Sequence, residues 1–133
     1  MPFVVDASVA ASWLLPDEGH PVAAMAYNRL TNDTALVPSI WWFEMRNLFI
    51  VNERRGRLDS NKTDKALSLL RALPIQLDSH PDELSLMRLA RRHRLTAYDA
   101  AYLELALREN LVLATLDAAL ASAALAEGMT LIR

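Results

Sequence analysis

Short apolar runs along this chain alternate with longer segments whose apolar residues recur every three or four positions. The short runs are rich in β-branched residues and are bounded by proline, aspartate or glycine, which is typical of buried strands. About five such strands are predicted, at residues 3–5, 35–37, 75–77, 111–114 and 130–132.

The longer segments have the periodicity and the boundary residues of helices. Seven helices are predicted, at residues 7–15, 21–30, 40–55, 60–73, 82–93, 98–109 and 118–127. Pro16 is expected to stop the first helix, and the side chain of Ser39 is expected to cap the third. Gly56 and Gly128 follow the third and the last helix, where glycine commonly ends a helix.

This alternation of strand and helix predicts the fold class. Neighbouring parallel strands need long crossover connections, and helices supply them, so the pattern favours an α/β fold. We expect a parallel β-sheet of about five short strands with helices on both faces. The chain of 133 residues is expected to form a single domain, residues 1–133.

The composition narrows the class of protein further. Hydrophobic residues make up 53% of the chain and charged residues 23%, a balance typical of an ordered globular protein. Cysteine is absent, which excludes disulfides and thiolate metal sites. The first residues lack the basic segment of a signal peptide, and no apolar stretch reaches the ~18 residues of a membrane span. We therefore expect a cytoplasmic protein without a membrane partner.

The net charge of −2 argues against a simple nucleic-acid binder, because such proteins usually carry a basic excess. Binding of RNA would need a local basic surface. Two groups of arginines are candidates, Arg54-Arg55-Arg57 and Arg91-Arg92-Arg94. Each group is equally compatible with a solvated helix end.

Acidic residues occupy the places where an α/β sheet carries its function, just beyond the carboxyl ends of the strands. Asp6 and Asp117 follow predicted strands, and Glu44 and Asp99 are expected in the first turns of helices that start at the same edge. Four converging carboxylates repel one another unless a cation neutralises them. Oxygen ligands alone favour Mg²⁺ or Mn²⁺, ions that activate water in phosphodiester hydrolysis.

Each acid also has a simpler explanation. The three aspartates suit the N-cap position of the helices they precede or begin. Glu44 lies among large apolar residues, where a charge needs a partner, and a salt bridge to Arg46 or Arg54 is the alternative.

Four segments of the chain, in this order and spacing, resemble the PIN domains, and within them the VapC-like toxins of bacterial toxin-antitoxin pairs. They are residues 4–8, 38–47, 95–102 and 113–117, so the resemblance spans nearly the whole chain. The resemblance implies a metal-dependent endoribonuclease that uses Mg²⁺ or Mn²⁺ and leaves 5′-phosphate and 3′-hydroxyl ends. It also implies that Asp6, Glu44, Asp99 and Asp117 are the metal-binding and catalytic positions.

Three further residues are candidates for supporting roles. Ser8 and Thr115 resemble the hydroxyl positions of the same motifs, where an oxygen can orient a carboxylate, although ordinary helix capping is the alternative. Asn47 follows Glu44 by three residues on one helical face, so its amide is a candidate contact to substrate or to a ligand carboxylate, or else to backbone.

The resemblance also implies partners: an RNA substrate, a homodimer and a cognate antitoxin. Two rival functions remain open. One is a catalytically inert PIN-like module that binds RNA or protein. The other is a phosphoaspartate phosphatase or receiver domain, which lacks support because position 8 is Ser8 rather than a second aspartate, and the only lysines are Lys62 and Lys65 in a predicted helix.

Overall fold

A four-stranded parallel sheet is the centre of the computed structural model, which describes residues 1–15 and 18–133. Its strand order is β3-β2-β1-β4. The strands are β1 (Phe3–Val5), β2 (Ala35–Pro38), β3 (Ile75–Asp78) and β4 (Leu113–Ala114). Val4 pairs with Leu36 on one side and with Leu113 on the other, so β1 lies inside the sheet. The predicted parallel α/β fold is confirmed.

The prediction of a fifth strand at residues 130–132 is wrong. In this segment Leu131 forms one isolated parallel bridge to Leu113. The bridge has two backbone hydrogen bonds, from Leu113 to Thr130 and from Ile132 to Leu113. Because β4 is only two residues long, and not the four predicted, it offers too short a template for a further strand.

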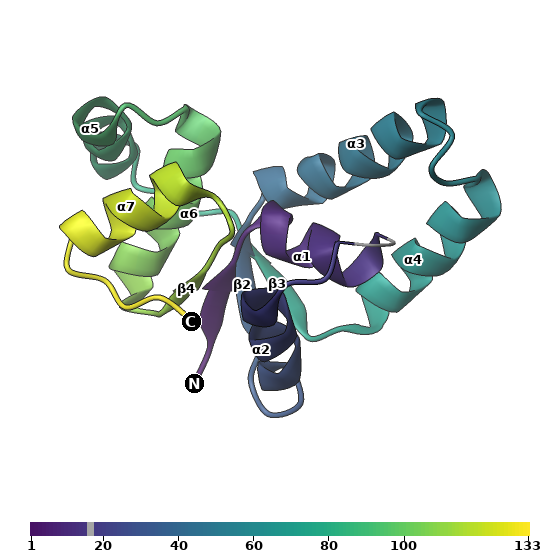
Figure 1. Cartoon of the computed structure of the whole chain (residues 1–133). Coiled ribbons are helices and arrows are strands. Elements are labelled where there is room, and N and C mark those ends of the chain that lie inside the picture. The colour runs from purple at the N-terminus through teal and green to yellow at the C-terminus, as the bar shows by residue number, and fades with distance from the viewer. Residues whose placement is uncertain (16–17) are drawn as a thin grey trace.

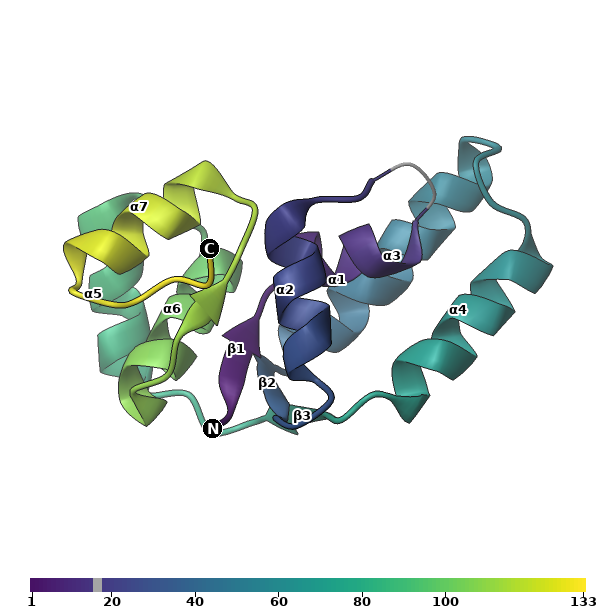
Figure 2. The same cartoon turned by 60° about the horizontal axis from the view of Figure 1, so that its bottom comes forward.

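The described residues form seven helices, as predicted. They are α1 (Ala7–Leu14), α2 (Pro21–Arg29), α3 (Ile40–Arg54), α4 (Ser60–Ala72), α5 (Glu83–His93), α6 (Ala97–Glu109) and α7 (Ala118–Ala126). Helices α5, α6 and α7 lie on one side of the sheet, and α1, α2, α3 and α4 lie on the other (Figure 1). The same two groups separate when the molecule is turned (Figure 2).

Side-chain caps explain where most of these helices begin. Asp6, Asp59, Asp82, Thr96 and Asp117 each accept a hydrogen bond from a backbone N–H in the first turn of the helix that follows.

Two predicted helix boundaries have other outcomes. Ser39 precedes α3 but makes no side-chain capping bond, so that prediction is wrong. Its backbone is helical, with φ −58° and ψ −28°, whereas a capping residue usually has an extended backbone that turns its side chain toward the free N–H groups. The predicted stop at Pro16 lies outside the described residues.

The core lies on both faces of the sheet, because each strand of a parallel sheet is covered by helices. Phe3, Val4, Val5 and Leu113 are fully buried in it. A smaller apolar cluster joins α1, α3 and α4 through Ala11, Leu15, Phe49 and Ala66. In the described part of the chain, no helix is both long and apolar enough to cross a membrane.

Candidate active site

Four acidic side chains meet at the edge of the sheet where the strands end. Asp6 follows β1 and caps α1, and Asp117 follows β4 and caps α7. Glu44 lies on α3, which follows β2, and Asp99 lies in the first turn of α6. Because β2, β1 and β4 are parallel neighbours, their carboxyl ends bring the starts of α3, α1 and α7 together (Figure 1).

The placement of Glu44 differs slightly from the prediction. Helix α3 begins at Ile40, so Glu44 is its fifth residue and lies in the second turn, not the first. The start of the helix itself agrees with the predicted range, residues 40–55.

The four carboxylates are close enough to influence one another's charge. Burial raises the pKa of Asp6 above its usual range, and the charge of Asp117 raises it further. Burial also raises the pKa of Glu44, to which the charges of Asp99 and Asp6 add. For Asp99, burial and then the charge of Asp117 raise the pKa. The interactions form a closed ring of like charges, which we call the acid ring: Asp6, Glu44, Asp99 and Asp117.

Asp6 is the most firmly held member of the acid ring. It is 5% exposed, and its Oδ1 accepts hydrogen bonds from Ser8 Oγ at 2.6 Å and from the Val9 N–H at 3.1 Å. Its Oδ2 accepts a hydrogen bond from the hydroxyl of Thr115. These bonds oppose the upward shift of its pKa, since hydrogen bonds to a carboxylate favour the charged form.

The two hydroxyls that hold Asp6 also connect it to the loop before α7. The Leu116 N–H donates to Ser8 Oγ at 3.0 Å, and the Asp117 N–H donates to Thr115 Oγ1 at 3.0 Å. Ser8 and Thr115 therefore bond to Asp6 directly, as their predicted orienting role requires. Whether they act in catalysis stays a prediction.

Glu44 has a partner that the sequence did not reveal. The buried Tyr102 donates a hydrogen bond from its hydroxyl to Glu44 Oε1. Burial and this bond raise the pKa of Tyr102, so the hydroxyl stays protonated as a donor. Tyr102 follows Asp99 by three residues on α6, a spacing that places both on one helical face and was the available signal. Neither Arg46 nor Arg54 pairs with Glu44 among the described ion pairs.

Asn47 is the one predicted site residue that the structure does not connect to the others. Its side chain is exposed on α3, and it appears in none of the side-chain hydrogen bonds of residues 1–15 and 18–133. A role in contacting substrate stays a prediction.

The chemistry of the acid ring fits a divalent cation. None of the ion pairs between residues that the structure describes involves Asp6, Glu44, Asp99 or Asp117. Burial and mutual repulsion both disfavour the charged forms, and a cation relieves that repulsion. Carboxylate oxygens are the ligands that Mg²⁺ and Mn²⁺ prefer.

The ring is not, however, a closed cage. Across the described residues, no group of three or more acidic or histidine side chains is arranged so that it could hold a metal ion. The capping bonds of Asp6 and Asp117 and the tyrosine bond of Glu44 turn these carboxylates toward protein donors. Mg²⁺ commonly binds through one or two carboxylates and keeps several waters, so this open arrangement fits it better than a fully enclosed ion.

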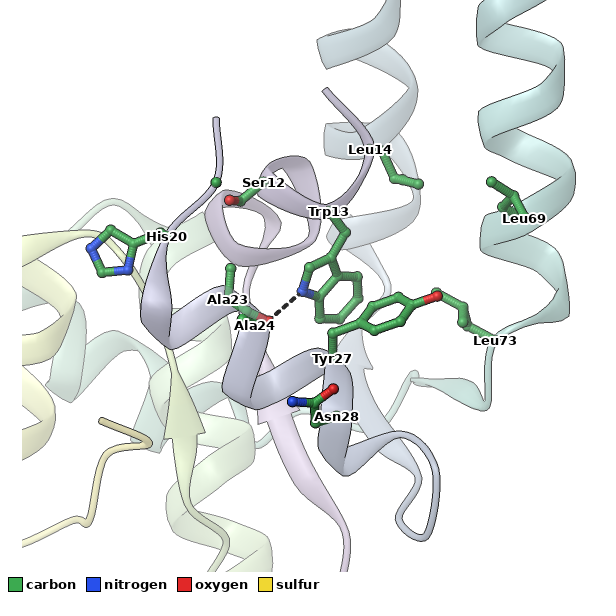
Figure 3. Close-up of a pocket in the computed structure, with 11 residues that line it drawn as sticks. Ser12, Trp13, Leu14, His20, Ala23, Ala24, Tyr27, Asn28, Leu69 and Leu73 are labelled. Atoms are coloured by element: carbon green, nitrogen blue, oxygen red, sulfur yellow. Dashed lines mark hydrogen bonds between the residues drawn. The ribbon is translucent and has the colours of Figure 1, made fainter. Parts of the chain in front are cut away.

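A separate apolar cavity of about 310 Å³ lies between α1, α2 and α4 and contains none of the acids (Figure 3). Trp13 crosses it, donating from Nε1 to the Ala23 carbonyl at 2.8 Å and packing edge-on against Tyr27. Among the described residues that line it, His20 and Tyr27 are the titratable ones and none is a carboxylate, so the chemistry of the protein is better sought at the acid ring.

Replacing Thr115 with valine tests the bond network around Asp6. Valine keeps the shape but removes the donor to Asp6 and the acceptor for the Asp117 N–H. We expect a loss of about 1–2 kcal/mol in the free energy of unfolding, measured in urea. If the acid ring is catalytic, activity should also fall by about 10-fold or more. Thr115→Ser, which keeps the hydroxyl, is the control, and equal losses in both variants would contradict the role of the hydroxyl.

A comparison with protein families finds a match over almost the entire chain. The family model described as PIN domain matches residues 3–132. No curated protein sequence matches the chain.

Solved structures with a similar fold include proteins from three organisms. PAE2754 from Pyrobaculum aerophilum has 24% sequence identity and a TM-score of 0.68, over 92% of this chain and 84% of that one. FitAcB from Neisseria gonorrhoeae has 17% sequence identity and a TM-score of 0.68, and the match covers 100% of this chain and 97% of that one. VapC20 from Mycobacterium tuberculosis is described as a sarcin-ricin loop cleaving toxin. It has 12% sequence identity and a TM-score of 0.59, and the match covers 91% of this chain and 94% of that one. At these identities the similarity establishes the fold.

Proposed function

Because this chain belongs to the PIN domain family, we propose that it is a metal-dependent endoribonuclease. It hydrolyses RNA phosphodiester bonds at the acid ring and leaves 5′-phosphate and 3′-hydroxyl ends. The observation that carries the proposal is the ring itself: four mutually repelling carboxylates from four different helices or their N-caps, with none of the described cations paired to them. A structural role would not require such an arrangement.

The cofactor in this proposal is Mg²⁺ or Mn²⁺, and Asp6, Glu44, Asp99 and Asp117 would hold it, directly or through the waters that such an ion keeps. When bound, the ion lowers the pKa of water and stabilises charge on the leaving oxygen. Asp6 is fixed in place by Ser8, Thr115 and the start of α1, so it presents its free lone pairs in one orientation. Glu44 is held by Tyr102 through one oxygen, which leaves the other for a ligand.

Metal binding gives a test that does not depend on knowing the RNA target. Mn²⁺ at a free concentration of 100 times its Kd should stabilise the protein by about 2.7 kcal/mol, which raises the unfolding midpoint by about 10 °C. Asp6→Asn should lose most of this gain. The raised pKa values of Asp6, Glu44 and Asp99 make protons compete with the ion at a higher pH than usual, so the gain should shrink as the pH falls from neutral.

An equal rise in the unfolding midpoint of wild type and Asp6→Asn would place the ion elsewhere and would contradict the proposed site. A direct assay completes the test: cleavage of a mixed RNA pool should require Mn²⁺ or Mg²⁺ and should stop when a chelator is added. Cleavage that persists in chelator would overturn the metal dependence.

We also propose that the protein is the toxin of a toxin-antitoxin pair, acting as a homodimer that a cognate antitoxin inhibits. Support comes from the sequence resemblance to VapC-like toxins and from the fold shared with VapC20, which is described as a toxin. Induced expression should arrest growth, and Asp99→Asn should not. Growth arrest that is unchanged in this variant would separate toxicity from the acid ring.

An inert binding module is the second candidate, and the intact acid ring argues against it. A phosphoaspartate phosphatase or receiver domain has still less support. The position where it needs a second aspartate is Ser8, whose hydroxyl bonds to Asp6 instead.

A further inference from the structure

Helix α5 carries Arg88, Arg91 and Arg92, and Arg94 follows its last residue, so that four arginines fall into two pairs. Arg88 and Arg92 lie 3.9 Å and 3.4 Å from the carboxylate of Glu127, at the end of α7. Arg91 and Arg94 are exposed and take part in none of the ion pairs or side-chain hydrogen bonds formed between described residues. The first pair thus joins α5 to α7, whereas the second pair is available for an external anion.

The second pair lies at the corner that leads to the acid ring. Arg94 ends α5 in the left-handed conformation, with φ 54°, and its N–H bonds back to the carbonyl of Ala90. The chain reverses there, and α6 begins at Ala97 and packs against α5 along its length (Figure 1). Asp99, a member of the acid ring, follows in the first turn of α6. Only four residues therefore separate Arg94 from a ring carboxylate.

In the sequence, an exposed aromatic residue lies between Arg94 and that carboxylate. Tyr98 directly precedes Asp99 and is 60% exposed, in contrast to Tyr102 on the same helix, which is 1% exposed. Tyr98 takes part in no aromatic pair among the residues that the structure describes. Exposed aromatic rings and free arginines are the groups with which proteins hold single-stranded nucleic acid, since bases stack on the rings and phosphates bind the guanidinium groups.

We propose that Arg91, Arg94 and Tyr98 form the surface that holds single-stranded RNA next to the acid ring. This inference rests on the proposed nuclease function and names its substrate-binding residues. The arginines bind backbone phosphates, which the net negative charge of the chain would otherwise repel, and Tyr98 stacks on a base beside the bond that is cut.

The chain contains a matched control for the arginines. Arg54 and Arg55 are also exposed, adjacent to a helix end and absent from the described ion pairs. They lie at the far end of α3, ten residues beyond Glu44, which is about 15 Å along the helix axis. Their replacement removes the same charge from the protein without touching the proposed surface.

The test measures binding of a labelled single-stranded RNA by Asp6→Asn protein, which should not cut it. Adding Arg91→Ala and Arg94→Ala should weaken binding about 10-fold and reduce the slope of log affinity against log salt by about 1.4, or 0.7 for each phosphate that is no longer neutralised. Replacing Arg54 and Arg55 with alanine should change both the affinity and the salt slope much less. Tyr98→Ala should also weaken binding about 10-fold, and Tyr98→Phe, which keeps the ring, should restore it.

Equal losses of RNA affinity on replacing the two arginine pairs would show that only net charge matters, and would overturn the proposal. Unchanged affinity in the Arg91→Ala, Arg94→Ala protein would also overturn it. Hydrolysis of bis-p-nitrophenyl phosphate with Mn²⁺ separates this inference from the nuclease proposal. This small diester has no RNA chain to hold, so its hydrolysis by the wild type depends on the acid ring alone. No hydrolysis by the wild type would count against the nuclease function, whatever the binding results show.

Discussion

Replacing Asp99 with asparagine should lower the rate of RNA cleavage at least about 100-fold and leave the fold intact. Loss of one preorganised charge at a reacting centre typically costs about 10²–10³ in rate. Asparagine has nearly the same shape, and the cap of α6 is the hydroxyl of Thr96 rather than Asp99, so the helix start is preserved. Removing the charge also relieves the burial of a charged group and its repulsion by Asp117, which together raise the pKa of Asp99 in the wild type.

The measurement is the initial rate on one RNA at saturating Mn²⁺, together with the unfolding midpoint of the metal-free protein. Asp64→Asn on α4 is the matched control, because Asp64 is exposed and lies outside the acid ring. We expect the control to cut at the wild-type rate and Asp99→Asn to unfold at or above the wild-type midpoint. A fast Asp99→Asn enzyme would remove this residue from the catalytic group.

The second large effect concerns stability and lies away from the acid ring. Arg108 on α6 donates to both carboxylate oxygens of Glu104, with the closer contact at 2.8 Å, and it bonds to Asp78 at the end of β3 at 2.7 Å. The Glu104 side chain is only 2% exposed. Arg108→Ala would leave this charge buried without its partner, and we expect a loss of about 3 kcal/mol in the free energy of unfolding.

Urea unfolding measures this loss, and Arg57→Ala is the control. Arg57 pairs with Glu18, but both side chains are about 40% exposed, so that pair should contribute less than about 1 kcal/mol. Combining Arg108→Ala with Glu104→Gln should recover part of the stability, since the buried group is then neutral. Equal losses in the free energy of unfolding for Arg108→Ala and Arg57→Ala would contradict a larger contribution from the buried pair.

Arg108 also makes the stability of the protein depend on pH. Hydrogen bonding from Arg108 lowers the pKa of Asp78 below its usual range. A carboxyl whose pKa is lower in the folded state stabilises the protein above its unfolded pKa, and this contribution is lost as the pH falls through the folded value. Wild type should therefore lose more stability on acidification than Arg108→Ala does.

The acid ring was largely predictable because it depends on the order of strands and helices along the chain. Asp6 and Asp117 follow strands, and parallel strands bring their ends to one edge whatever the details of packing. The bond from Tyr102 to Glu44 was not predictable in the same way, because it joins α6 to α3 across 58 residues and no local pattern encodes that approach. The spacing of Tyr102 from Asp99 indicated a shared face, but not a shared partner.

Local conformation explains the remaining differences. Ser39 has the right chemistry for a cap, but its helical backbone prevents the capping bond. Residues 130–132 have the composition of a strand, but pairing depends on the length of the neighbour, and β4 has only two residues. Composition predicts which conformation a segment prefers, whereas its neighbours decide whether that preference is realised.

The bond from Thr115 to Asp6 spans 109 residues, and β1 pairs with β4 across a similar distance. During synthesis on a ribosome, the first acid therefore emerges long before the hydroxyl that orients it and before Asp117. A growing chain holds Asp6, Glu44 and Asp99 without the strand that completes the sheet around them. In the proposed nuclease, the acid ring is therefore incomplete until translation is almost finished.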